Sequence, residues 1–175
     1  NLQPSTVNPP LGLWPADVHV IGKDILKFHA VYWPILLKAL GLPLPRLILV
    51  HGWWQKDGQK MSKTTGNVVD PIAVMDQWGV DAFRYYATRE LDLGPDGNWT
   101  DASFQARYHA ELANGLGNLV NRSLSMLKRY RNGLVPPPSA ELASEITTGV
   151  EATLAQLRQY QLQGALQTIW SMVNR

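Results

Sequence analysis

DVHVIGKDILKFHAVYWPILLKALGLPLPRLILV, residues 17–50, is the stretch that decides the fold. It begins with a short β-branched run at 17–21, DVHVI, and ends with a continuous apolar run at 46–50, RLILV. Such runs, bounded by Gly and Pro, predict buried strands. Residues 25–40 lie between them and carry an apolar residue at every fourth position, which predicts one face of a helix. Those residues are Phe28, Tyr32, Leu36 and Leu40.

This order of strand, helix and strand predicts a βαβ unit with parallel strands. Sheets of this kind place ligands at the carboxyl ends of their strands. In this sequence those ends are followed by residues 22–24, GKD, and by residues 51–54, HGWW. We therefore predict a nucleotide site at these two segments, within an α/β domain.

The segment after the second strand carries the signals of a hairpin, a loop and two helices. Asp57-Gly58 is a strong two-residue hairpin signal. Residues 60–67 are polar, small and cationic, which predicts a surface loop. Asp70-Pro71 predicts a capped helix start, and a second helical pattern follows a break at Gly79.

Residues 91–98 are rich in turn-forming residues, and we place a domain boundary there, between residues 1–98 and residues 99–175. Beyond it, Thr100 or Asp101 can cap a long helix that ends near residue 130. Its predicted apolar stripe comprises Phe104, Tyr108, Leu112, Leu116, Leu119, Val120, Leu124 and Leu127. One further helix is predicted from residue 141 onward, with core positions at Leu142, Ile146, Val150, Leu154, Leu157 and Leu166.

The composition narrows the class of protein. An apolar fraction of 45% suits a packed core, and a net charge of +2 requires any RNA contact to be local. The chain has no Cys, which excludes disulfides and Cys-based zinc ligands. No apolar run is long enough to predict a membrane helix. Neither end carries a start or stop signal of its own, so we expect a piece of a longer protein.

The strongest motif is a loop with two lysines three residues apart and small residues between them, a pattern suited to polyphosphate. It reads KMSKT at residues 60–64, inside GQKMSKTTGNVVDP at residues 58–71. It lacks the spacing of a Walker A loop. The alternative is an ordinary solvated basic loop. The whole string resembles the KMSKS signature of class I aminoacyl-tRNA synthetases with its GNVVDP extension, although Thr64 stands where that family usually has Ser.

The second motif extends from His19 through the first strand end into the helix. Gly22 permits close backbone approach to a ligand, and Asp24 can accept hydrogen bonds from ribose hydroxyls or can simply cap the helix. The segment resembles the HIIGKDIxxFHxxYWP pattern of methionyl enzymes. The resemblance implies that Ile25 and His29 line a methionine pocket, and that Gly22 and Asp24 approach the ribose. By itself His29 would more often be a core histidine.

Two weaker segments extend the resemblance to nearly the whole chain. His51-Gly52 resembles the family's HG segment, where the residue at Trp54 contacts adenine through its backbone; hairpin packing is the alternative for its side chain. LANGLGNLVNR at residues 112–122 resembles the start of the family's anticodon-binding bundle. It implies that Asn118 and Arg122 read anticodon bases, whereas a polar helix face is usually just solvated.

The resemblance implies a fold class: the second half of a Rossmann-type parallel-sheet catalytic domain, followed by part of an all-α helical bundle. It implies methionine activation by ATP with Mg²⁺ and transfer to tRNA(Met), in the cytoplasm or an organellar matrix. The catalytic residues would be Lys60 and Lys63. The ATP-binding residues would be Gly22, Asp24, His51, Trp54, Lys60, Met61, Ser62, Lys63 and Thr64.

This sequence does not hold the family's first catalytic half, so we expect no activity from it in isolation. Another class I specificity, such as leucyl or cysteinyl, and a non-catalytic tRNA-binding module remain alternatives. The sequence leaves the oligomeric state open.

Overall fold

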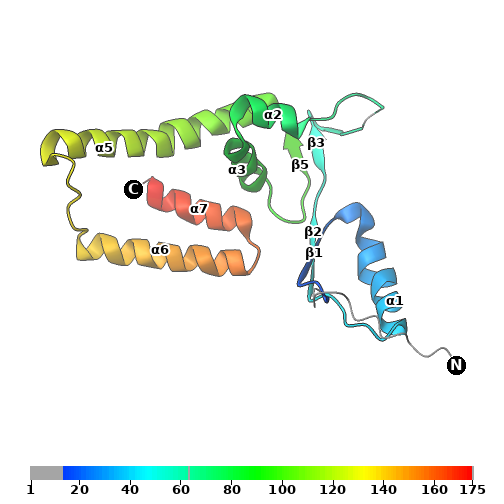
Figure 1. Cartoon of the computed structure of the whole chain (residues 1–175). Coiled ribbons are helices and arrows are strands. Elements are labelled where there is room, and N and C mark those ends of the chain that lie inside the picture. The colour runs from blue at the N-terminus through cyan, green and yellow to red at the C-terminus, as the bar shows by residue number, and fades with distance from the viewer. Residues whose placement is uncertain (1–13, 63, 175) are drawn as a thin grey trace. The chain divides into compact units, whose positions relative to one another are not determined.

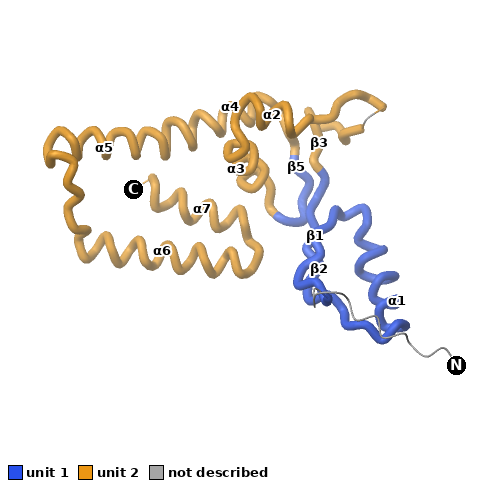
Figure 2. Tube along the Cα trace, in the orientation of Figure 1, with its two compact units in different colours: residues 1–53, 93–97 blue, residues 54–92, 98–175 orange. Residues whose placement is uncertain are grey.

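The computed structural model describes residues 14–62 and 64–174 (Figure 1). By their contacts these residues form two compact units, which Figure 2 colours separately. Unit 1 comprises the described residues up to 53 together with 93–97, and unit 2 comprises 54–92 and 98 onward. The units do not coincide with the domains predicted at 1–98 and 99–175, and that division stays a prediction.

Unit 1 contains the predicted βαβ unit. Strands β1, Val18–Gly22, and β2, Leu47–His51, pair in parallel, with Val18 opposite Leu47 and Gly22 opposite His51. The register brings the two carboxyl ends side by side, as the sequence predicted. Ile21 on β1 is buried.

The helical connection between the strands is not a uniform α-helix. It consists of a 3-10 turn η2, Lys23–Ile25, a π-helical segment η3, Phe28–Tyr32, and α1, Trp33–Ala39. Pro34 has no N–H to give to the preceding turn, and the wider π spacing accommodates that loss. The buried residue of α1 is Leu37, which is 1% exposed. The predicted face is largely exposed instead: Phe28, Tyr32, Leu36 and Leu40.

Unit 2 begins with the predicted hairpin. Strands β3, Trp54–Lys56, and β4, Gln59–Lys60, pair antiparallel. Asp57 and Gly58 both have positive φ, at 52° and 76°, as a type I′ turn requires. Strand β5, Gly97–Trp99, adds to the other edge of β3, so the end of the predicted turn-rich segment is a strand.

Two short helices follow the loop after β4. Helix α2, Pro71–Trp78, is capped by Asp70, whose carboxylate accepts from the N–H of Ile72 at 2.9 Å. Helix α3, Val80–Glu90, begins directly after Gly79. The core of unit 2 comprises Ala82, Tyr86, Trp99 and Phe104.

The predicted long helix is continuous from residue 101 to residue 131. It passes from α4, Asp101–Arg107, through a π-helical segment η4, Tyr108–Gly117, into α5, Asn118–Arg131. Thr100 caps it by accepting from the N–H of Ser103 at 2.9 Å. The predicted apolar stripe is buried only in its first half: Phe104, Tyr108 and Leu112 pack on the core, whereas Leu116, Leu119, Val120 and Leu124 are exposed.

The last predicted helix is in fact two. Helix α6, Ala140–Arg158, ends where Tyr160 adopts a φ of 61°, and α7, Leu162–Val173, packs back against α6 (Figure 1). The expectation of a single helix containing Leu166 was therefore wrong. A left-handed Tyr carries no sequence signal comparable to Gly. No described helix is both long enough and apolar enough to span a bilayer.

Candidate functional site

The carboxyl ends of β1 and β2 bring three predicted ATP-site residues together in unit 1. A Cβ on Gly22 would lie 2.5 Å from Oδ1 of Asp24 and 3.7 Å from Cε1 of His51. The glycine thus leaves room for the Asp24 carboxylate to lie over the strand end. The indole N–H of Trp53 donates to the same Oδ1 at 3.4 Å. Nδ1 of His51 lies 2.8 Å from the carbonyl oxygen of Gly52 and must carry the proton, because a carbonyl only accepts.

A third segment of this site was not predicted from the sequence. Residues 93–97 return to unit 1, and a Cβ on Gly52 would lie 1.9 Å from the Pro95 carbonyl oxygen. Asp96 accepts from the N–H of Trp53 at 2.8 Å and from Nζ of Lys23 at 2.6 and 2.7 Å. The Lys23 ammonium also lies 4.3 Å from the centre of a Trp53 ring. The glycine at position 52 was the one sequence signal for this close approach, but a glycine does not show which segment packs against it.

These contacts set the charge at the strand ends. The hydrogen bond from Lys23 lowers the pKa of Asp96, and the bond from the Trp53 N–H lowers it further. A carboxylate whose pKa falls on folding stabilises the fold at neutral pH. That stabilisation is lost as the pH drops through the lowered value. Asp96 is therefore a carboxylate at neutral pH and neutralises the ammonium beside Asp24.

The residues predicted to bind methionine lie on the helical connection between β1 and β2. His29 faces a hollow of about 400 Å³ that is almost wholly apolar, shared with His19, Phe28, Tyr32, Trp33 and Leu36. Its Nδ1 lies 3.0 Å from the carbonyl oxygen of Ile25, so that nitrogen carries the proton. Ile25 therefore meets His29 through its backbone, and its side chain is not among those lining the hollow.

The KMSK loop belongs to unit 2, and its described part is held by its own polar groups. Oγ of Ser62 lies 2.6 Å from Oγ1 of Thr64, and the Thr64 N–H donates to Oγ of Ser62 at 3.3 Å. Met61 packs beside the buried core. Lys60 ends strand β4 and is exposed. Lys63 lies outside the described residues.

Asn67 organises this loop, and the sequence reasoning missed it. Its Oδ1 accepts from the N–H of Ser62 at 2.8 Å and from the hydroxyl of Thr65 at 2.7 Å. Its Nδ2 donates to the carbonyl oxygen of Lys60 at 3.0 Å. One amide therefore ties the start, middle and end of the loop together.

The side chain of Trp54 packs against the core of unit 2. Its ring centre lies 6.1 Å from Tyr86 and 6.3 Å from Trp99. The packing alternative for this side chain agrees with these contacts, which are to helix α3 and strand β5. A backbone contact with adenine is unaffected and remains a prediction.

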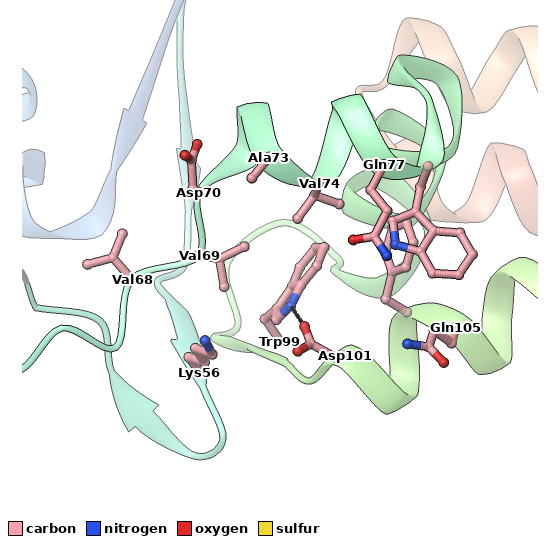
Figure 3. Close-up of a pocket in the computed structure, with 12 residues that line it drawn as sticks. Lys56, Val68, Val69, Asp70, Ala73, Val74, Gln77, Trp99, Asp101 and Gln105 are labelled. Atoms are coloured by element: carbon pink, nitrogen blue, oxygen red, sulfur yellow. Dashed lines mark hydrogen bonds between the residues drawn. The ribbon is translucent and has the colours of Figure 1, made fainter.

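Unit 2 also contains a hollow of about 320 Å³ beyond the loop (Figure 3). Val68, Val69 and Asp70 form one wall, and helices α2 and α4 form others. Trp99 closes it, with its indole N–H donating to Asp101 at 3.0 Å. Among the described loop residues, 60–62 and 64–67, none lines it.

The predicted anticodon residues lie one turn apart on α5. Asn118 and Arg122 are both exposed. The preceding turns are held by Glu111, which accepts from the Tyr85 hydroxyl and from Arg107 at 3.0 Å. Burial raises the pKa of Tyr85, and the bond to Glu111 raises it further. This helix is therefore anchored at its base and presents its polar face to solvent.

Within residues 14–62 and 64–174, no three His, Asp or Glu side chains are arranged to hold a metal ion.

Comparison with known proteins gives the family. A family model described as tRNA synthetases class I (M) matches residues 14–124, which is well over half of the chain. The chain belongs to this family of class I tRNA synthetases. The match includes the strand ends, the KMSK loop and the polar face of α5, so both of the strong motif assignments fall within it.

Curated relatives of this synthetase family are closely similar. The chain is 46% identical over 170 residues to methionine–tRNA ligase 1 of Bacillus anthracis and 44% identical over 171 residues to methionine–tRNA ligase of Clostridium perfringens. Each match covers 93% of this chain and 26% of the relative. The chain thus spans about a quarter of the length of the curated relatives it matches.

Solved synthetase structures confirm the fold class. The chain is similar to Mycobacterium tuberculosis methionyl-tRNA synthetase bound by methionyl-adenylate, with a TM-score of 0.84 and 42% identity over 93% of this chain and 33% of that one. A second structure of that enzyme with methionyl-adenylate gives a TM-score of 0.87 and 41% identity over 97% and 35%. The α/β and all-α parts predicted from the sequence are therefore those of a class I synthetase.

Proposed function

We propose that this chain supplies the later part of the catalytic domain and the start of the anticodon-binding bundle of a methionine–tRNA ligase. In that reaction the carboxylate of methionine attacks the α-phosphate of ATP, giving methionyl-adenylate and pyrophosphate. A terminal ribose hydroxyl of tRNA(Met) then takes the aminoacyl group. The observation that carries the proposal is the family match over residues 14–124, which contains both strong motifs.

The first step is an in-line displacement at phosphorus, which needs positioning and charge neutralisation rather than acid–base groups. Lys60 and Lys63 neutralise the charge that grows on the leaving pyrophosphate. Ser62 and Thr64 hold the loop in shape, which their mutual 2.6 Å contact supports. Mg²⁺ arrives with ATP and adds charge neutralisation on the triphosphate.

The ribose of ATP lies at the strand ends of unit 1 in this proposal. Asp24 accepts from its hydroxyls, and Gly22 allows the sugar to come close. His51 borders the same space, and the Trp54 backbone contacts adenine. The 2.5 Å approach of the Asp24 carboxylate to the vacant Cβ position of Gly22 supports this role, because any side chain there would displace the carboxylate.

The remaining predicted residues bind methionine and tRNA in this proposal. Nδ1 of His29 is engaged by the Ile25 carbonyl oxygen, and its ring borders an apolar hollow. An apolar hollow suits the thioether side chain of methionine. Asn118 and Arg122 read unpaired anticodon bases by hydrogen bonding and stacking. A cytoplasmic location is part of the proposal.

The test uses the full-length protein that contains this chain. Pyrophosphate exchange into ATP should depend on methionine and should not respond to leucine or cysteine. Exchange driven by leucine or cysteine would favour another class I specificity. No exchange with any amino acid, together with retained tRNA binding and no ATP binding by calorimetry, would establish a non-catalytic module instead.

A further inference from the structure

Asp96 is the side chain that joins the three segments of the strand-end site in unit 1. It belongs to the segment 93–97, which follows α3 and packs against the residues directly after β2. Its carboxylate contacts Lys23, which is 73 residues away, and the N–H of Trp53, which is 43 residues away. A side chain that ties together chain segments this distant acts on the geometry of whatever the segments build.

We propose that Asp96 is a positioning residue of the nucleotide site, acting on Asp24 through Lys23 and Trp53. The inference rests on the proposed function, because it takes Asp24 as the acceptor for the ribose hydroxyls. Asp96 touches no substrate in this account. It orients the group that does.

The first path of this action runs through charge. Lys23 is adjacent to Asp24, and a mobile ammonium there would pair with the Asp24 carboxylate and compete with the ribose. Both oxygens of Asp96 hold that ammonium, at 2.6 and 2.7 Å. The Trp53 ring covers it at 4.3 Å. Charge-assisted bonds this short are the strong kind, so Lys23 is kept in place and Asp24 keeps its acceptor capacity.

The second path runs through Trp53. The Asp96 Oδ1 atom fixes its main-chain N–H at 2.8 Å, and its indole N–H donates to Oδ1 of Asp24 at 3.4 Å. The backbone of Pro95 also packs closely on Gly52, the neighbour of Trp53, since no Cβ fits at residue 52. One Asp24 oxygen is thereby oriented, and the other is available to the sugar.

The experiment compares Asp96→Asn with wild type in the full-length protein, using methionine-dependent pyrophosphate exchange. Asn keeps the shape and can still accept from the Trp53 N–H, but it loses the charged bond to Lys23. The KM for ATP should rise about tenfold, the scale of one charge-assisted hydrogen bond. The KM for methionine should change less than about twofold, because the apolar hollow beside His29 is untouched.

The matched control is Asp17→Asn. Asp17 pairs with Arg46 at 3.1 Å in the same unit, with both side chains nearly fully exposed, and it should leave both KM values unchanged. Thermal unfolding of all three proteins reports whether either change acts through stability. A parallel rise in both KM values with a lowered melting temperature would give Asp96 a merely structural role and overturn the inference.

A second readout uses 2′-deoxy-ATP and 3′-deoxy-ATP. If Asp96 acts through Asp24, the Asp96→Asn change should raise the KM for at least one analogue by less than about twofold. The hydrogen bond from that ribose hydroxyl to Asp24 is already absent in the analogue. An equal penalty with ATP and both analogues would refute the path through Asp24. Wild-type exchange activity separates the two claims: its absence removes the proposed function, whereas an active wild type with an unaltered Asp96→Asn variant removes only this inference.

Discussion

Replacing Asn67 with Ala should slow methionine activation with little effect on the stability of the fold. The change removes three hydrogen bonds, of 2.7, 2.8 and 3.0 Å, that join the hydroxyl of Thr65, the N–H of Ser62 and the carbonyl of Lys60 to one amide. Each contributes about 0.5–1.5 kcal/mol net when both partners are held in place. Water compensates for part of this loss because the site is half-buried. We therefore expect the ordered conformation of the loop to lose about 2 kcal/mol of stability.

At about 1.4 kcal/mol per tenfold change, that loss corresponds to roughly a 30-fold decrease in kcat/KM for ATP. The assay is pyrophosphate exchange by the full-length protein. The melting temperature should barely move, because a surface loop opens independently of the core. Asn114→Ala is the matched control, since Asn114 is exposed on η4 and the exchange reaction needs no tRNA. An Asn67→Ala variant with the same kcat/KM as this control would refute the reasoning.

Three further predictions concern the loop, the helix and the core. Lys63→Ala should lower the activation rate by about 2–4 kcal/mol of transition-state stabilisation while methionine affinity stays constant, and unaltered exchange kinetics would exclude a catalytic role. Arg122→Ala should weaken tRNA(Met) binding about 10- to 100-fold and leave exchange intact; equal binding of tRNAs with altered anticodons by wild type would argue against base reading. Trp99→Ala should cost about 3–5 kcal/mol of unfolding free energy, because Trp99 is 4% exposed and stacks on Phe104. A denaturant midpoint equal to that of wild type would contradict this.

Local signals in the sequence predicted the elements that position the site. The apolar runs at 17–21 and 46–50 identified parallel strands, and their pairing follows from the βαβ order. Asp57-Gly58 predicted the type I′ turn because few residues tolerate positive φ at both positions. Asp70 predicted the start of α2 because its side chain satisfies a backbone N–H there.

Long-range contacts were beyond the reach of such signals. Asp96 lies in a segment that looks like a simple turn, and its partners Lys23 and Trp53 are 73 and 43 residues away. Asn67 resembles any loop residue until its three partners are known. The apolar stripes of α1 and α5 predicted helices correctly, but a stripe does not specify what covers it, and large parts of both are exposed.

The central claim is that Asp24 binds the ribose of ATP and that the lysines of the KMSK loop bind its phosphates. A crystal structure of the full-length protein with a non-hydrolysable ATP analogue tests it directly. The account predicts a ribose hydroxyl at hydrogen-bonding distance from the Asp24 carboxylate, about 2.6–3.2 Å, and phosphate oxygens at about 2.7–2.9 Å from a loop lysine. A nucleotide bound with its ribose away from Asp24, or with its phosphates out of reach of both Lys60 and Lys63, would contradict it.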